Sequence, residues 1–422
     1  MASLGTTGVD DTVSSQGSTL SNSQGRIAIT SLTSLFFMWG FITAMNDILI
    51  PHLKGVFDLT YTQAMLVQFC FFGAYFLVSM PAGYIVSKLG YKTGIALGLV
   101  CAAVGCVLFV PSAKLSLYWM FLLGLFVLAS GVTILQVAAN PLVTLIGNPD
   151  TASSRLNMTQ AFNSLGTTVA PIIGGILIFG SVDTETNANH VETVIVPYLT
   201  LAAILVLLAV LSRFVTLPNH TSPQVTPTLD GVVKRTPLAH YKHLVLGAVG
   251  IFVYVGAEVS IGSFMISFLG EKHIAGLTES EAAHYVAYFW GGAMIGRFIG
   301  AAIMQKIRAN RLLAFNSLAA IVLLGIAITS SGKVAMWALL ATGLCNSIMF
   351  PTIFSLGIAK LGIDTSRGSG LLCLAIVGGA IIPVFQGLIA DASGLQTSFL
   401  LPVICYVFIA FYGAKGYRPN QG

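Results

Sequence analysis

Long runs of apolar residues, separated by short polar segments, dominate the pattern of the chain. Most runs hold about 20 residues or more, which is the length that an α-helix needs to cross the hydrocarbon core of a bilayer. Several are longer still, which indicates tilted helices or helices that extend beyond the bilayer. The pattern predicts an all-α membrane protein with twelve transmembrane helices, at residues 27–51, 62–87, 93–112, 117–146, 154–180, 193–216, 243–270, 280–306, 310–330, 333–362, 366–391 and 395–415.

Two longer segments lack this apolar pattern. Residues 1–25 are rich in Ser, Thr and Gly and lack the basic start and apolar core of a signal peptide, so we expect a disordered tail. Residues 217–242 hold three prolines in their first half and three basic residues, which is typical of a linker. The expected organisation is therefore a tail (1–25), a six-helix bundle (26–216), a linker (217–242), a second six-helix bundle (243–415) and a short tail (416–422).

The distribution of lysine and arginine predicts the orientation. If the N-terminus and every second loop lie on one side, that side holds 15 of the 20 Lys and Arg residues, the other side holds 4, and Arg297 lies inside a span. Loops with an excess of Lys and Arg stay in the cytoplasm. We therefore expect both termini and the linker in the cytoplasm, and the net charge of +5 reflects these loops.

Composition excludes several classes of function. The chain is 55% hydrophobic and 8% charged, with a mean hydropathy of +0.87, whereas a soluble domain has about a quarter charged residues. The six cysteines lie in apolar runs without metal or disulfide spacing, so they indicate buried thiols. The sequence contains no GxxxxGK[ST], HExxH or G-x-S-x-G pattern, so an ATP-driven pump or a hydrolase has no support. We expect no enzyme, no metal site and no cofactor other than a coupling proton.

The second half of the chain repeats part of the first. The run SRLNMTQAFNSLGTTVAPIIGG begins at Ser154, and SRGSGLLCLAIVGGAIIPVFQG begins at Ser366, 212 positions later. Six spans separate the copies, so both run in the same direction across the membrane. Parallel six-span repeats are typical of secondary transporters, whose substrate site lies near the midplane between the halves. Identical pairs in this register include Arg155/Arg367, Gly166/Gly378, Pro171/Pro383 and Gly175/Gly387.

An amide and a carboxylate stand side by side in the first apolar run, at Asn46 and Asp47. An ionisable group inside a membrane is costly and is a candidate functional site by default. A carboxyl group in apolar surroundings can hold a proton near neutral pH and release it, which suits proton coupling. The structural alternative is that Asp47 lies near the outer end of the span and hydrogen-bonds a neighbouring helix.

Four further amides form polar stripes on two apolar spans. Their spacing of three or four residues puts each pair on one helix face. Amides donate and accept hydrogen bonds, which suits a neutral polyhydroxylated ligand, although such side chains also join helices. Trp39 and Tyr75 are candidates for the flat apolar surface that a sugar ring needs. The amides are Gln136 and Asn140 in the fourth span and Gln160 and Asn163 in the fifth.

The second half holds fewer polar side chains. Glu258 in the seventh span is a candidate second titrating group or half of an ion pair, and Arg297 in the eighth is expected to pair with an acid or cap a helix end. Basic residues at the inner face are expected to act in gating rather than in binding. This gating group is Lys88, Lys92, Arg155, Arg297 and Arg367.

Four stretches carry a resemblance to a known family: LFFMWGFITAMNDILIPHLK, LVQFCFFGAYFLVSMPAG, SGVTILQVAANPLVTLIG and SRLNMTQAFNSLGTTVAP. They resemble the major facilitator superfamily and, within it, the fucose–galactose–glucose proton symporters, above all the bacterial glucose/galactose branch. The resemblance runs from about residue 27 to 412. It implies import of glucose and/or galactose with protons by alternating access, across the bacterial inner membrane.

The resemblance also implies roles for particular residues. Asp47 matches the membrane aspartate that carries the proton, and Gln160 and Asn163 match the sugar-contact motif. The chain departs from the fucose permease at Gln136, where that protein has a glutamate. Three consequences stay open: Asp47 couples alone, Glu258 shares the coupling, or the coupling is weaker than in the fucose branch.

Other functions remain compatible with these patterns. An importer of N-acetylglucosamine or fucose and an uncoupled sugar facilitator would share the same spans, while a membrane sugar sensor is disfavoured because the tails are short. In each case the expected partners are a monosaccharide and the lipid bilayer, with no nucleic acid, and the chain is expected to function as a monomer.

Overall fold

The computed structural model describes residues 28–44, 61–179, 194–214 and 236–419, and these residues form helices without any strand. The candidate residues Asn46 and Asp47 lie outside the described ranges. After a first helix, Ala28–Ala44, the long helices are α2 (Tyr61–Leu89), α3 (Tyr91–Lys114), α4 (Tyr118–Leu145), α5 (Ala152–Phe179), α6 (Ile195–Phe214), α7 (Lys242–Gly270), α8 (Glu279–Ile303) and α9 (Ala309–Thr329).

Three predicted spans near the C-terminus are each divided rather than continuous. Residues 333–362 form α10 (Gly332–Asn346) and α11 (Met349–Gly357), and residues 366–391 form α12 (Thr365–Leu374), a 3₁₀ turn η5 (Ala375–Val377) and α13 (Gly378–Ser393). The last span comprises α14 (Leu395–Ser398), α15 (Leu400–Phe411) and a π-helical end η6 (Tyr412–Gly416). At the break after α10, the carbonyl of Ser347 accepts a hydrogen bond from Arg297 of α8 at 3.0 Å.

Ten helical stretches in the described ranges are long and apolar enough to cross a membrane, and Ala28–Ala44 is a shorter apolar helix. The first part of helix α5, 152–170, is rich in Ser, Thr, Asn and Gln. Regular helices are expected here, since a backbone in hydrocarbon must satisfy its own hydrogen bonds. Many large apolar side chains point outward, such as Phe69, Leu207, Val322 and Ile404, as lipid-facing surfaces require.

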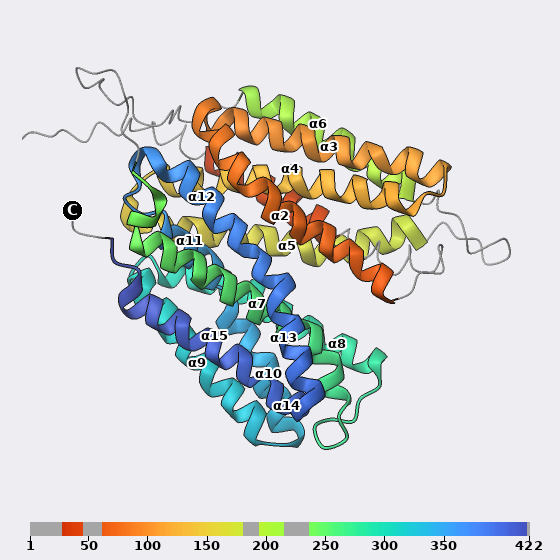
Figure 1. The fold of residues 1–422 in the computed structure, drawn as a ribbon, viewed down its shortest axis with the longest axis vertical. Coiled ribbons are helices and arrows are strands. Elements are labelled where there is room, and N and C mark those ends of the chain that lie inside the picture. Colours follow the sequence, from red (N-terminus) through yellow and green to blue (C-terminus); the bar gives the residue numbers. More distant parts are fainter. Residues whose placement is uncertain (1–27, 45–60, 180–193, 215–235, 420–422) are drawn as a thin grey trace, which may run out of the picture.

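The helices pack in two groups that meet along a small set of helices. Helix α3 packs on α4 and α6, whereas α9 packs on α10 and α15, and α7 packs on α13. Between the groups, α2 packs on α12 and α5 packs on α8 and α11. The two groups converge at the end where the C-terminus and the start of α12 lie, and their helices diverge toward the opposite end (Figure 1). We call the converging end the basic end, because α2, α3, α5 and α12 place Lys88, Lys92, Arg155 and Arg367 there.

Small polar side chains join the two groups near the basic end. The hydroxyls of Ser153 on α5 and Ser355 on α11 lie 2.7 Å apart, and Ser154 donates to the carbonyl of Ala301 on α8 at 2.6 Å. On the neighbouring pair of helices, Ser369 of α12 donates to the carbonyl of Val137 on α4 at 2.9 Å. These contacts hold the basic end closed in this conformation.

Candidate functional site

The amides of α4 lie in a buried polar cluster with aromatic residues of two other helices. Gln136 is 3% exposed and donates its Nε2–H to the hydroxyl of Tyr75 on α2. The same hydroxyl is hydrogen-bonded to the side chain of Trp39 on the first helix. Three of the predicted substrate residues therefore contact one another, although they come from three different helices. The side-chain oxygen Oε1 of Gln136 is buried and has no hydrogen-bond partner among the described residues.

A pair of amides lies one helical turn nearer the basic end than Gln136. Asn140 of α4 and Gln160 of α5 are both buried, and Nε2 of Gln160 lies 3.4 Å from Oδ1 of Asn140. The Nδ2 group of Asn140 is buried without a partner in the described ranges. Since unpartnered buried polar groups are costly, the free acceptor of Gln136 and the free donor of Asn140 together indicate a place for a hydroxyl-rich ligand.

Asn163 is committed to a helix contact. Its Nδ2 donates to the backbone carbonyl of Phe36 on the first helix at 3.0 Å. The two helices approach so closely that a Cβ at Gly40 would overlap the backbone oxygen of Asn163. The structure thus gives Asn163 the interhelical role that the amide stripe left open, and this contact positions the face of α5 that also carries Gln160.

The second group of helices contributes a polar cluster of its own. The hydroxyl of Tyr254 on α7 donates to the carbonyl of Asn346 at 3.0 Å, and the hydroxyl of Tyr406 on α15 donates to Oδ1 of Asn346 at 2.6 Å. Glu258 of α7 competes with the backbone carbonyl of Asn346 for the single proton of the Tyr254 hydroxyl. Nδ2 of Asn346 and Oε1 of Glu258 are buried and unpartnered in the described structure. This cluster therefore also presents one free donor and one free acceptor.

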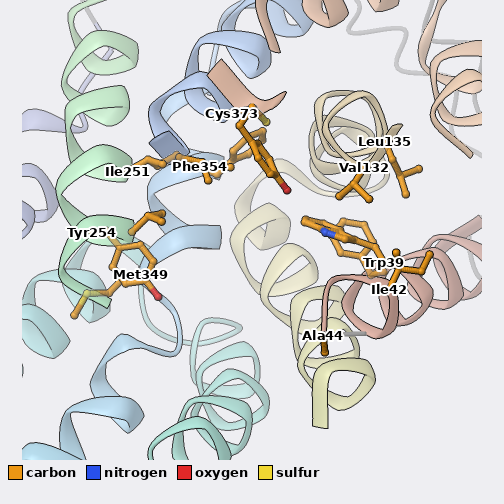
Figure 2. Close-up of a cluster of buried hydrophobic side chains, with 14 of the residues drawn as sticks. Trp39, Ile42, Ala44, Val132, Leu135, Ile251, Tyr254, Met349, Phe354 and Cys373 are labelled. Carbon is orange, nitrogen blue, oxygen red and sulfur yellow. The ribbon is translucent and has the colours of Figure 1, made fainter. Parts of the chain in front are cut away.

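Figure 2 shows how the two clusters are placed. Trp39 extends from the first helix toward the middle of the view, while Tyr254 lies on α7 at the opposite side with Met349 beside it. Apolar side chains such as Val132, Leu135 and Ile251 surround these aromatic residues. The polar groups that could bind a ligand are thus embedded in apolar surroundings, as in most small-molecule sites.

The predicted gating residues at the basic end contact backbone carbonyls, an aromatic ring or a carboxylate. Lys92 donates to the carbonyl of Arg213 at 2.8 Å, and Lys88 lies over the ring of Tyr84. Arg155 donates to carbonyls at the end of α4, including Thr144 at 3.0 Å, and Arg367 pairs with Asp364 at 2.9 Å.

Arg297 differs from the rest of the gating group, because it lies within α8 and contacts both groups of helices. Its Nε donates to Ser347 at the α10–α11 break, and its Nη1 donates to Ser164 of α5 and to the carbonyl of Gln160 at 3.4 Å.

Tyr406 was missed as a functional candidate. The signal for Tyr406 is a hydroxyl within the apolar run LLPVICYVFIAF of α15, where a buried tyrosine must find a partner. No group of three His, Cys, Asp or Glu residues in the described ranges could hold a metal ion. Of the six cysteines, three are buried and three are half-buried, and all are free thiols.

Comparison with known proteins places the fold and the site in context. The model of the Major Facilitator Superfamily matches residues 29–372. A glucose/galactose transporter of Brucella abortus is 58% identical over 92% of this chain and 94% of its own. The L-fucose-proton symporter of Escherichia coli is 35% identical over 92% of each chain. The crystal structure of the transporter FucP in the outward conformation superposes with a TM-score of 0.84 at 34% identity, covering 93% of this chain and 99% of that one.

Proposed function

The chain belongs to the Major Facilitator Superfamily, and from this premise we propose that it imports a monosaccharide, glucose or galactose, together with a proton. It is a carrier and not an enzyme. The observation that carries the proposal is the pair of buried, unpartnered amide groups on α4, Gln136 Oε1 and Asn140 Nδ2. The identity of 58% to a glucose/galactose transporter supports the choice of sugar.

The chemistry of the free groups suits a neutral sugar. Each hydroxyl of a hexose donates one hydrogen bond and accepts others, so it can satisfy an amide oxygen and an amide N–H at neighbouring positions. The second cluster offers the same pair of functions from Asn346 and Glu258. A sugar held between the two clusters would satisfy groups of both halves at once, which fits a site near the midplane between repeats.

Proton coupling follows from the relationship to a protein named as a proton symporter. Asp47 is the candidate proton carrier, because it is the only carboxylate within the first six predicted spans, and Glu258 is the second candidate. Protonation of Asp47 from outside would favour sugar binding, and the loaded carrier would then turn inward, release both and return empty.

The proposed topology has twelve transmembrane helices in two six-helix bundles, 26–216 and 243–415, with both termini and the linker in the cytoplasm of a bacterial inner membrane. In this arrangement the basic end faces the cytoplasm. The contacts of Ser153, Ser154 and Ser369 would then close the inner side, as expected of a carrier that faces outward. The chain is proposed to act as a monomer in the bilayer without a cofactor.

Uptake of labelled sugars by cells that lack their own hexose transporters tests this proposal. The panel contains glucose, galactose, fucose and N-acetylglucosamine, and an electrode records the external pH in weakly buffered medium. We expect uptake of glucose or galactose with alkalinisation of the medium. Uptake without alkalinisation would identify a facilitator, and preference for fucose or N-acetylglucosamine would overturn the choice of sugar.

A further inference from the structure

Arg297 is a charged side chain that reaches across both groups of helices. On the side of the second half, its Nε donates to the carbonyl of Ser347 at 3.0 Å, where the helical hydrogen-bond pattern is interrupted between α10 and α11. On the side of the first half, its Nη1 donates to Ser164 Oγ and to the carbonyl of Gln160 at 3.4 Å. One guanidinium thus ties α5 to α8 and α10.

The turn of α5 that Arg297 holds is the turn that carries a predicted sugar contact. Ser164 itself donates to the carbonyl of Gln160 at 3.2 Å, while the side chain of Gln160 lies beside Asn140. Any movement of Arg297 away from α5 therefore removes hydrogen bonds from the backbone that supports Gln160. This arrangement couples the position of α8 to the geometry of the amide cluster.

Arg297 also lies within electrostatic range of Glu258, but the two form no ion pair in this conformation. Glu258 lies beside the Tyr254 hydroxyl and keeps one buried oxygen without a partner among the described residues. The titratable groups around Glu258 are Tyr254 and Tyr406 besides Arg297. Two opposite charges that are close but unpaired in an apolar region are expensive, and a conformation that joined them would recover part of that cost.

We propose that Arg297 exchanges partners during the transport cycle, holding Ser164 and Gln160 of α5 while the basic end is closed and pairing with Glu258 when it opens. The proposal rests on the proposed function, since it assumes that the two groups of helices separate at the basic end. Opening that end draws α5 away from α8, so the guanidinium must leave α5 and needs another acceptor. Glu258 supplies one, because it has a free oxygen and lies within electrostatic range of Arg297. Arg297 is therefore a positioning residue.

The test measures closure of the basic end rather than sugar transport. Cysteines replace Ser153 and Ser355, whose hydroxyls lie 2.7 Å apart, in the full-length chain reconstituted in vesicles, and mass spectrometry quantifies the disulfide between them. In this background the combination of Arg297→Gln with Glu258→Gln should lower the ratio of closed to open protein about tenfold relative to Glu258→Gln alone, as expected from losing a charge-assisted hydrogen bond of the closed form. Arg308→Gln is the matched control, because Arg308 is exposed at the start of α9.

The effect of Glu258→Gln separates partner exchange from simple loss of stability. Removing the second partner should favour the closed form and raise the yield of the disulfide or keep it at the level of the parent. The double variant should behave like Arg297→Gln alone. Equal yields for Arg297→Gln and Arg308→Gln, each combined with Glu258→Gln, would overturn the proposal, and so would a yield for Glu258→Gln alone that falls below the parent. Because crosslinking needs no sugar, a failed uptake assay would count against the proposed function and leave this result interpretable.

Discussion

The buried polar side chains of the two halves differ in kind. In the first half they are amides joined to aromatic side chains, with Gln136 on Tyr75 and Asn140 beside Gln160. In the second half two tyrosines hold the amide residue Asn346, one through its backbone carbonyl and one through its side-chain oxygen. Glu258 and Arg297 bring opposite charges close to that amide.

Two repeats of one fold can therefore serve different steps of transport. A neutral cluster can bind a neutral sugar without a penalty for unpaired charge, whereas charges inside a membrane must find partners in every conformation. We therefore assign most of the sugar affinity to the amides of the first half. The second half holds the amide of Asn346 in a fixed position. It also carries the charged side chains Glu258 and Arg297, whose contacts change when the helices move.

The largest effect is expected from the carboxylates, one in each half. Asp47→Asn cannot release a proton, so the ratio of internal to external sugar should fall to about one, while exchange of labelled for unlabelled sugar continues. Glu258→Gln should still accumulate sugar, at a lower rate. The measurement is steady-state accumulation and counterflow in proteoliposomes with an imposed proton gradient. Accumulation by Asp47→Asn together with its loss in Glu258→Gln would move the proton site to the second half.

Truncation of the free amides should have the next largest effect. Gln136→Ala or Asn140→Ala removes groups that await a ligand, so the KM for sugar should rise about 5- to 150-fold, the range expected from about 1–3 kcal/mol. Initial rates of uptake across sugar concentrations measure this change. Asn316→Ala is the control, since Asn316 of α9 is a half-buried amide whose Nδ2 donates to the carbonyl of Cys345 within the second group of helices. A KM unchanged from that control would remove the amides from the sugar site.

The spans and the amide stripes could be predicted from periodicity, because apolar length and spacing of three or four residues are local properties of the sequence. The hydrogen-bond partners of these amides could not be predicted, since they depend on which helices lie against one another. Asn163 and Gln160 lie three residues apart and look alike in the sequence. In the structure Asn163 binds the backbone of Phe36 while Gln160 faces Asn140. The breaks at Ser347 and at Ala375–Val377 were missed for the same reason, because apolar composition does not reveal where a carbonyl leaves its helix.

The orientation of the Asn346 side chain in the second half should depend on the tyrosines that bind it. Tyr406→Phe removes the hydroxyl that holds Oδ1 of Asn346, so the side chain can rotate and its donor is less well placed. We expect the KM to rise about 2- to 12-fold with little change in maximal rate, the range for one neutral hydrogen bond. Tyr412→Phe provides the control, because that buried hydroxyl binds the carbonyl of His243 near the basic end. If both variants raise KM equally, the second cluster has no special part in binding.

The smallest effect on transport itself is expected from a packing contact that the two halves share. Gly166 and its repeat partner Gly378 each approach a phenylalanine carbonyl in the first helix of their half, Phe37 and Phe252, so closely that a Cβ would overlap it. Alanine at either position should lower stability by about 1–3 kcal/mol through overpacking, measured as the shift in thermal unfolding in detergent. Gly73→Ala on α2 should be neutral or stabilising, because nothing lies within 4 Å of the added carbon. Similar losses at Gly166 and Gly378 would support a common packing rule behind two different polar clusters, while a loss at only one would mean that the repeat has diverged in packing as well as in chemistry.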